Sequence, residues 1–526
     1  MKVLVSDPIS SKGIDLLRQE EGIEVDVKIG LSPQELLQVI PEYEALVVRS
    51  ETKVTAPVID AARSLRVVGR AGIGVDNVDV PAASKRGIIV MNTPGGNTIT
   101  TAEHAISLLL ALARKIPQAY ASLQAKKWDR KRFVGVEVYK KTLGVVGLGR
   151  IGSVVADRAK GLGMNVIAFD PHISPEVAER IGVEFVDFNE ILRRSDFISV
   201  HVPLTPETRG LLGAEAFTRT KNGVRIINCA RGGIVDEKAL YDAIKSGKVA
   251  GAALDVFEKE PPGDNPLLSL EEVVCTPHLG ASTDEAQEQV GVEIAQQIIA
   301  YLKHSEIQNA VNVPSVGGEL LRKLRPYLQL CEQMGSLTSQ LVERGIQEIH
   351  VRYSGEVAHM GIKPLTVALL KGVLRPFLGE TVNEVNAPVV AHERGIKVYE
   401  TTSSETEYYT SLVDLTLKTD REERRAAGTV FGRHDPRIVM IDGYQIEATP
   451  AGYILVFGNI DTPGVIGKIG TILGSNQINI AGMQLGRKAP NDKAVSFVNV
   501  DSEIPPNVLA EIQALPNILF AKLVKL

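Results

Sequence analysis

Short apolar runs rich in β-branched residues recur over the first 93 residues and alternate with amphipathic segments. Segments such as SPQELLQVI (32–40) separate the runs and end in Gly or Pro signals. Alternation of this kind predicts βα units and a parallel sheet. The expected strands are KVLVSD (2–7), VDVKI (25–29), ALVVRS (45–50), RVVGRAG (66–72) and IIVMNT (88–93).

The same pattern starts again after a long predicted helix at 101–116, for which Thr100 or Thr101 can act as N-cap. A second helix, at 282–305, closes this series. Two parallel-sheet units in succession favour a two-domain α/β enzyme with a cleft between the units over one large sheet. The expected strands are TLGVVG (142–147), NVIAFD (165–170), DFISVHV (196–202), VRIINCA (224–230), AGAALDVF (250–257) and VVCTPH (273–278).

After residue 310 the pattern changes. NVPSVGG (312–318) is typical of a linker. Strands are expected at 348–354, 409–419 and 437–448. Residues 453–526 alternate as strand, helix, strand, strand, helix, strand, the pattern of a split βαβ sandwich.

Composition narrows the possible classes of protein. The 526 residues are 44% hydrophobic and 23% charged, with a net charge of −5, so the chain lacks the basic excess that nucleic-acid or anionic-membrane binding needs. The apolar helical run at 105–113 is too short to cross a membrane. The three cysteines match no zinc or disulfide spacing, which fits a reducing compartment. We therefore expect a cytosolic protein that binds no metal, nucleic acid or membrane.

A glycine-rich segment follows a predicted strand and begins a predicted helix. Gly147 permits a tight turn, Gly149 lets the backbone approach a pyrophosphate, and Gly152 allows the helix to pack closely on the strand. The next strand ends in Asp170, whose carboxylate can accept both ribose hydroxyl protons and repels a 2′-phosphate. Together the glycines and Asp170 favour dinucleotide binding over a purely structural turn. The carboxylate favours NAD over NADP as the cofactor.

Three side chains follow later strands of this unit, at the edge where open α/β sheets bind ligands. Taken singly, Arg231 is typical of a solvated group, Glu260 of a loop residue and His278 of a structural histidine. Hydride transfer from a 2-hydroxy acid needs a base for the hydroxyl proton, a carboxylate that orients this base and a cation for the substrate oxygens. We expect His278, Glu260 and Arg231 to take those roles.

The chain resembles the D-2-hydroxyacid dehydrogenases, and within them the long-form phosphoglycerate dehydrogenases, in the motifs GLGRIG (147–152), NCARGGIVDE (228–237), ALDVFEKEP (253–261) and TPHLGAST (276–283). The resemblance implies that Arg231, Glu260 and His278 are the catalytic triad and that Asp255 lies beside the nicotinamide carboxamide. It also implies an NAD pocket that includes Arg150, Ile151, Cys229, Ala230, Leu279, Gly280 and Ala281.

The resemblance further implies two Rossmann-like or flavodoxin-like parallel-sheet domains, an α+β intervening domain and a ferredoxin-like ACT domain. The first domain, which binds substrate, would be discontinuous. The family also implies a homotetramer. The implied boundaries are 1–95 with 285–310 for this domain, 96–284 for the NAD-binding domain, 315–450 for the intervening domain and 453–526 for the ACT domain.

Cations near the expected cleft bear on the choice of substrate. A glycine-rich backbone at 72–74 can donate N–H groups to a carboxylate, and a phosphate-bearing acid needs several further donors. In the family, the positions of Arg49, Arg70 and Arg130 contact the substrate's acidic groups, and one of them can come from a neighbouring subunit. The alternative for the run 126–132 is a solvated surface loop. The cations favour phosphoglycerate as the substrate. The resemblance implies oxidation of 3-phospho-D-glycerate to 3-phosphohydroxypyruvate, the first step of phosphorylated L-serine biosynthesis. The expected substrate-binding residues are Arg49, Arg70, Gly72, Ile73, Gly74 and Arg130.

The C-terminal resemblance to an ACT domain implies a small-molecule sensor. In serine-regulated relatives, the positions of Asn459, Asp461 and Asn479 hold the effector between two subunits, so L-serine is the expected effector. Asn459 stands where relatives often carry His or Tyr. A domain that only dimerises the protein stays open as an alternative.

Other functions also stay open at this stage. A hydroxypyruvate or glyoxylate reductase would use the same triad, and relative turnover of phosphorylated and unphosphorylated acids separates it. A binding protein, like the transcriptional corepressors that keep this fold and its NAD site, would produce no NADH. A serine sensor without catalysis would leave the triad idle.

Overall fold

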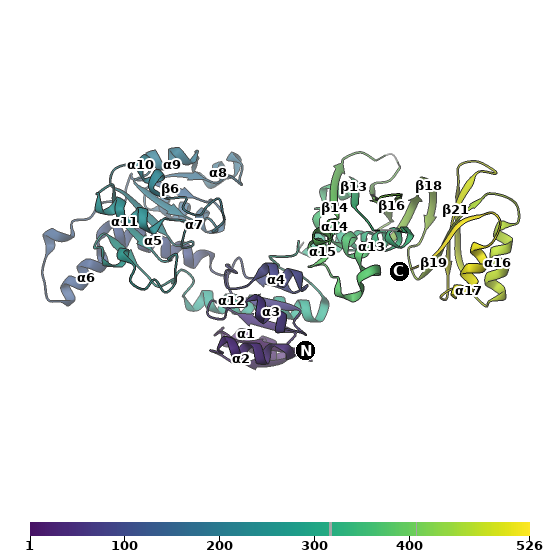
Figure 1. Ribbon diagram of the computed structural model, residues 1–526. Coiled ribbons are helices and arrows are strands. Elements are labelled where there is room, and N and C mark those ends of the chain that lie inside the picture. Colours follow the sequence, from purple (N-terminus) through teal and green to yellow (C-terminus); the bar gives the residue numbers. More distant parts are fainter. Residues whose placement is uncertain (315–317, 344, 407) are drawn as a thin grey trace.

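The computed structural model of the chain describes residues 1–314, 318–343, 345–406 and 408–526. Residues 315–317 of the predicted linker lie outside these ranges. Four sheets follow one another along the chain: two parallel, one mixed and one antiparallel (Figure 1). None of the helices in the described ranges is long and apolar enough to span a bilayer.

The first sheet is parallel and has the flavodoxin-like strand order β2-β1-β3-β4-β5. Four of its strands bury nearly every residue, as expected for strands covered by helices on both faces. The strands are β1 (Lys2–Val5), β2 (Glu24–Val27), β3 (Ala45–Val48), β4 (Val67–Arg70) and β5 (Ile89–Asn92). The helices are α1 (Ser11–Gln19), α2 (Pro33–Val39), α3 (Ala56–Ala61) and α4 (Val80–Lys85).

The second sheet is also parallel, in the order β12-β11-β10-β9-β6-β7-β8. Its strands are β6 (Thr142–Val146), β7 (Asn165–Phe169), β8 (Glu184–Phe185), β9 (Phe197–Val200), β10 (Val224–Asn228), β11 (Val249–Leu254) and β12 (Val273–Cys275). Its helices are α5 (Thr98–Arg114), α6 (Ile116–Gln124), α7 (Arg150–Gly161), α8 (Pro175–Ile181), α9 (Phe188–Arg194), α10 (Ala214–Arg219) and α11 (Glu237–Lys245).

The helix predicted at 101–116 is α5, which begins at Thr98 after the N-cap Asn97, so Thr100 and Thr101 lie inside the helix and do not cap it. A second helix, α6, follows and was not predicted. Lys115 adopts a left-handed conformation with φ of 52°, which ends α5 and starts α6. Pro117 explains the break, because within a continuous helix it would remove a hydrogen bond and clash with the preceding turn. In Figure 1, α6 stands out from the rest of the second unit.

Helix α12 (Asp284–His304) returns to the first sheet. Figure 1 shows it in teal among the purple helices of the N-terminal unit. Its residues Val290, Ile294 and Ile298 share a core with Val3 and Val67. The approach to α1 is close: a Cβ on Gly13 would lie 2.4 Å from the Gly291 carbonyl oxygen. Residues far apart in sequence therefore complete one core.

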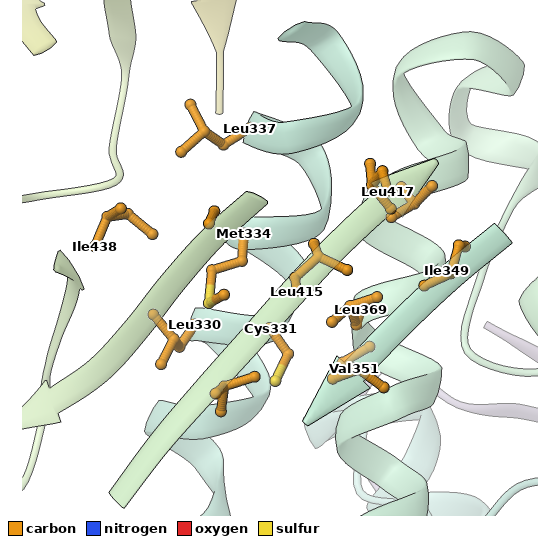
Figure 2. Close-up of a cluster of buried hydrophobic side chains, with 14 of the residues drawn as sticks. Leu330, Cys331, Met334, Leu337, Ile349, Val351, Leu369, Leu415, Leu417 and Ile438 are labelled. Atoms are coloured by element: carbon orange, nitrogen blue, oxygen red, sulfur yellow. The ribbon is translucent and has the colours of Figure 1, made fainter. Parts of the chain in front are cut away.

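The third sheet is mixed, in the order β14-β13-β15-β16-β17-β18. Its strands are β13 (Glu348–Gly355), β14 (Lys397–Ser403), β15 (Ser411–Lys418), β16 (Glu423–Phe431), β17 (Asp435–Ile441) and β18 (Tyr444–Ala448). The helices are α13 (Gly318–Leu341), α14 (Lys363–Leu378) and α15 (Ala387–Glu393). Figure 2 shows α13 residues such as Leu330 and Met334 packed against Leu415 of the sheet.

One strand predicted in this region was wrong. The segment 437–448 is a hairpin of β17 and β18, because Asp442 and Gly443 both have positive φ (49° and 81°) and form a tight two-residue turn. An Asp-Gly pair between apolar runs is a hairpin signal, so the sequence carried the information.

The last unit has the predicted βαββαβ order. Its strands are β19 (Tyr453–Ile460), β20 (Ile480–Arg487), β21 (Lys493–Val500) and β22 (Ile518–Lys525), and its helices are α16 (Val465–Ser475) and α17 (Pro506–Gln513). The sheet is antiparallel, in the order β20-β21-β19-β22. One face packs on its own helices through Leu455 and Phe457, whereas Ile454 and Val456 on the other face join the core of the third sheet.

Candidate active site

The glycine-rich loop lies between β6 and the N-terminus of α7. Gly147 has φ of 92°, and a Cβ there would lie 2.6 Å from the His201 carbonyl oxygen. A Cβ on Gly152 would lie 1.9 Å from the Gly147 carbonyl oxygen, so helix and strand meet without side chains. At Gly149 no heavy atom of the described residues comes within 4 Å of a Cβ position, which leaves the backbone open to a ligand.

Asp170 follows β7 and is fixed beside this loop. Its Oδ2 accepts a hydrogen bond from the Leu148 N–H at 2.9 Å, and its Oδ1 accepts one from the His172 N–H at 2.9 Å. Arg150 and Ile151 form the first turn of α7, whose N-terminal amides and dipole favour an anion. An open glycine loop, a helix N-terminus and an adjacent carboxylate fit the pyrophosphate and ribose of a dinucleotide.

Arg231 lies on the turn after β10 and reaches across to the first unit. The Asn228 side chain holds this turn, since its Nδ2 donates to the Arg231 carbonyl at 2.9 Å and its Oδ1 accepts from the Ala230 N–H at 3.0 Å. The Arg231 Nε donates to Asp76 Oδ2 at 2.8 Å. Its guanidinium lies against Gly74, where a Cβ would come within 1.9 Å of Nη2.

A cavity of about 600 Å³ lies between the two units. Arg70, one of its lining residues, has a pKa lowered to about 10, because burial and then the charges of Arg231 and Arg49 disfavour its cationic form. Because the three arginine side chains are all cationic, an anion bound near Arg70 would be stabilised by their charges. The cavity is lined by Arg49, Lys53, Arg70, Gly72, Glu260, His278 and Ala281, among others.

His278 and Glu260 meet at the cavity wall. The His278 Nδ1 lies 2.8 Å from Glu260 Oε2, and Glu260 Oε1 accepts the Phe257 N–H at 3.1 Å. Burial alone would raise the pKa of Glu260, but the hydrogen bonds from His278 and Phe257 and the His278 charge outweigh it and hold the pKa below its ordinary value. The carboxylate therefore stays ionised beside the imidazole.

Asp255 is 1% exposed and follows β11, where its carboxylate accepts the N–H groups of Leu279 and Gly280. Cys229 is buried against α5, and burial raises the pKa of its thiol. Burial also raises the pKa of Cys275, which lines the cavity, to about 11. Both thiols are therefore protonated at neutral pH and poor nucleophiles.

Some of the predicted binding residues lie apart from the others within the described ranges of the chain. Arg130 lies in an exposed 3₁₀ turn (Arg130–Phe133) outside the cavity lining. In the C-terminal unit, Asn459 and Asp461 lie at one end of the sheet, whereas Asn479 precedes the opposite end of the edge strand β20. Asp461 is paired with Arg487 at 2.8 Å, and Asn459 is 1% exposed.

The structure places three further residues at the site, Asp76, Thr101 and His104, for which no role in the site was predicted. Nothing in the sequence linked Asp76 to Arg231. Thr101 and His104 lie one helical turn apart on α5 and both face the turn that carries His278. A polar pair at i and i+3 within a largely apolar helix was the available signal. In the described ranges, no group of three or more His, Cys, Asp or Glu is arranged to hold a metal ion.

The sheets and the site define a class, which comparison with known proteins confirms. Residues 106–280 match the family model "D-isomer specific 2-hydroxyacid dehydrogenase, NAD binding domain", and residues 453–517 match the ACT domain. The chain is thus an NAD-dependent oxidoreductase of the 2-hydroxyacid dehydrogenase class. Residues 323–442 match the "D-3-phosphoglycerate dehydrogenase intervening domain".

Relatives extend this match over the whole chain. A D-3-phosphoglycerate dehydrogenase of Archaeoglobus fulgidus is 50% identical over 100% of both chains, and one of Bacillus subtilis is 44% identical over 100% of this chain and 99% of its own. The chain belongs to the D-3-phosphoglycerate dehydrogenase family, as its motifs predicted.

Solved structures resemble the first two units. D-lactate dehydrogenase from Aquifex aeolicus, complexed with NAD and lactic acid, has a TM-score of 0.53 and 27% identity, over 60% of this chain and 100% of that one. A glyoxylate reductase from Paecilomyes thermophila has a TM-score of 0.55 and 29% identity, over 59% and 98%. Both support the parallel-sheet α/β fold of the catalytic half.

Proposed function

We propose that this protein oxidises 3-phospho-D-glycerate to 3-phosphohydroxypyruvate with NAD, at the cavity between its first two units. The main observation behind the proposal is that a group of arginines and the His278–Glu260 pair lie at the same cavity. Arg49 and Arg70 of the first unit line the cavity, and the charge of Arg231 from the second unit lies close enough to lower the pKa of Arg70, so the cations suit a substrate with carboxylate and phosphate groups. The His278–Glu260 pair faces the same space.

The geometry suggests the role of each side chain. Because Glu260 engages Nδ1 of His278, the Nε2 is the nitrogen that takes the proton of the C2 hydroxyl. The Glu260 carboxylate then stabilises the imidazolium. Arg231 holds the substrate carboxylate and polarises the forming carbonyl. NAD, when bound at the Gly147–Gly152 loop beside Asp170, supplies the hydride acceptor.

We also propose that the enzyme is a cytoplasmic homotetramer in which Arg130 serves a neighbouring subunit's site. The arm formed by α6 and the following turn exposes large apolar side chains, with Tyr120 65% and Trp128 76% exposed. Apolar side chains gathered on a projecting arm are typical of subunit contacts. Arg130 lies on the same arm.

The C-terminal unit is proposed to bind L-serine between two subunits. Asn459 and Asp461 would come from one subunit and Asn479 from the other, because in one chain the first two lie at one end of the sheet and Asn479 lies at the opposite end. The Asp461–Arg487 pair would open or rearrange to admit the effector's ammonium group.

NADH oxidation tests the proposed function. Rates with 3-phosphohydroxypyruvate and hydroxypyruvate are compared, with and without L-serine. We expect a strong preference for the phosphorylated acid and a lower rate with serine. Equal or better rates on hydroxypyruvate would replace the proposal with a general reductase, and a rate indifferent to serine would leave the C-terminal unit as a dimerisation domain.

A charge variant makes the test specific for the phosphate. Removing one charge-assisted contact costs about 1.5–3 kcal/mol, so Arg49→Gln should raise KM for the phosphorylated acid by roughly 10- to 100-fold and change KM for hydroxypyruvate less. Arg63→Gln, an exposed cation of the same unit outside the cavity, is the matched control.

A further inference from the structure

We propose that His104 is a positioning residue for the reaction: through Asp255, its imidazole holds the turn that carries the catalytic His278. The inference rests on the proposed function, since it concerns the same site. His104 lies on α5, which also packs against β11 and β12, and its side chain is 19% exposed.

A compact hydrogen-bond network connects the two histidines. The Nε2 of His104 lies 3.1 Å from Asp255 Oδ1 and 3.1 Å from Thr276 Oγ1. Asp255 Oδ1 also accepts the Leu279 N–H at 2.7 Å, and Oδ2 accepts the Gly280 N–H at 2.8 Å. Asp255 therefore binds the two residues that immediately follow His278, and His104 binds Asp255.

Counting protons assigns the direction of these bonds. The Thr276 hydroxyl donates its single proton to Asp255 Oδ1 at 2.6 Å. Its oxygen and the carboxylate are then both acceptors where they face His104. The His104 Nε2 must therefore carry a proton and donate it to these acceptors. Position 104 requires a side chain long enough to place a hydrogen-bond donor beside Asp255.

The turn at His278 depends on these hydrogen bonds because its backbone adopts an unfavourable conformation. His278 has φ of 54°, a left-handed conformation that residues other than glycine rarely adopt. Its N–H donates to the Asp255 carbonyl at 2.8 Å. The buried Thr101 hydroxyl, one turn before His104 on α5, donates to the Gly280 carbonyl at 2.9 Å. One face of α5 thus holds the turn at two points.

The charge of Asp255 depends on the same contacts. Burial would raise the pKa of this carboxyl, but the hydrogen bonds from His104, Thr276 and the Leu279 N–H keep it below its ordinary value. Without the His104 donor, the buried Asp255 carboxylate loses one hydrogen bond, and the His278 turn that it holds becomes less rigid. His278 would then meet the substrate hydroxyl less often in the productive geometry.

The test compares His104→Gln, whose amide can still donate, with His104→Leu, which fills the space without a donor. Glu103→Gln, exposed on the same helical turn, is the control. We expect His104→Leu to lose about 10- to 100-fold in kcat with the KM for the hydroxy acid largely unchanged, and His104→Gln to recover most of that loss. Thr101→Val, which removes only the bond to Gly280, should lower kcat in the same way but less.

Several results would overturn the proposal. One is a kcat of His104→Leu equal to wild type, and another is an equal loss in the Gln and Leu variants. A fall in melting temperature without a fall in kcat would show a structural role only. If His104→Leu does not fold, an unchanged kcat in Thr101→Val decides against the proposal. Should the wild type prefer an unphosphorylated acid, the proposed function fails, and the same comparison is made on that acid.

Discussion

At the scale of single residues, the side chains of the proposed site each make a second contact that fixes their orientation. Glu260 accepts the Phe257 N–H with one oxygen while the other faces His278, and Arg231 donates to Asp76 while it lies on Gly74. Such contacts reduce the number of orientations each group can adopt before substrate arrives, which lowers the entropic part of the barrier.

The variant Glu260→Gln tests how far the Glu260 carboxylate supports His278, the proposed base. The amide is nearly isosteric but cannot stabilise an imidazolium by charge, so we expect kcat to fall by roughly 10²- to 10⁴-fold with NAD binding unchanged. Because the pKa of Glu260 lies below its ordinary value, the wild-type pair persists at neutral pH and is lost only as pH falls through that lowered pKa. Steady-state kinetics over a pH series would measure both effects.

Glu258→Gln is the matched control, since Glu258 is exposed and two residues away. It should behave as wild type. A Glu260→Gln enzyme with near-normal kcat would remove Glu260 from the mechanism.

At the scale of elements, the first unit depends on two helices that meet through glycine. In α1, a Cβ on Gly13 would lie 2.4 Å from the Gly291 carbonyl of α12, so any larger residue separates the helices. Ser10 and Lys12 near this crossing contact Glu288 of α12. The crossing therefore holds in place the helix that follows the His278 turn in sequence.

Gly13→Ala should destabilise this crossing by about 1–2 kcal/mol, because overpacking outweighs the gain in helix propensity. Gly470→Ala in α16 is the control of opposite sign: no heavy atom of the described chain lies within 4 Å of the new Cβ, so about 0.5–1 kcal/mol of stabilisation is expected. Native-state hydrogen exchange of α12 and α16 amides measures both. Increased protection of α12 in Gly13→Ala would contradict the packing argument.

At the scale of the whole molecule, the last two sheets share one hydrophobic core. Ile454 and Val456 of β19 belong to the same cluster as Leu330 of α13. The Gln340 side chain of α13 also makes two hydrogen bonds to the Lys525 backbone of β22, at 2.9 and 3.1 Å. The ACT unit and α13, the helix after the linker, therefore form one packed body.

Two buried-residue variants test this shared core. Ile454→Ala should cost about 2–5 kcal/mol and reduce hydrogen-exchange protection in α13 as well as in the ACT unit. Leu473→Ala, equally buried but in the core beneath α16, should reduce protection in the ACT unit alone. If both variants leave α13 unchanged, the two units unfold independently.

Local sequence signals predicted most of the fold. Strand–helix alternation, the glycine motif and the βαββαβ pattern depend on neighbours within a few tens of residues, so the printed sequence contains them. Helices α13 and α14 were missed, and their buried faces pack mainly on each other and, for α13, on strand β16 about 100 residues further along the chain. Helix α6 was also missed, although Pro117 marks its first turn.

What the sequence by itself determined is the class of protein and the chemistry available to it: an NAD-binding α/β enzyme with arginine, glutamate and histidine at strand ends. Only the tertiary structure decided which groups meet. The Arg231–Asp76 and His104–Asp255 pairs join residues 155 and 151 positions apart, and α12 packs on α1 across 278 positions. Contacts at such separations depend on how whole units pack, and no local pattern of residues encodes them.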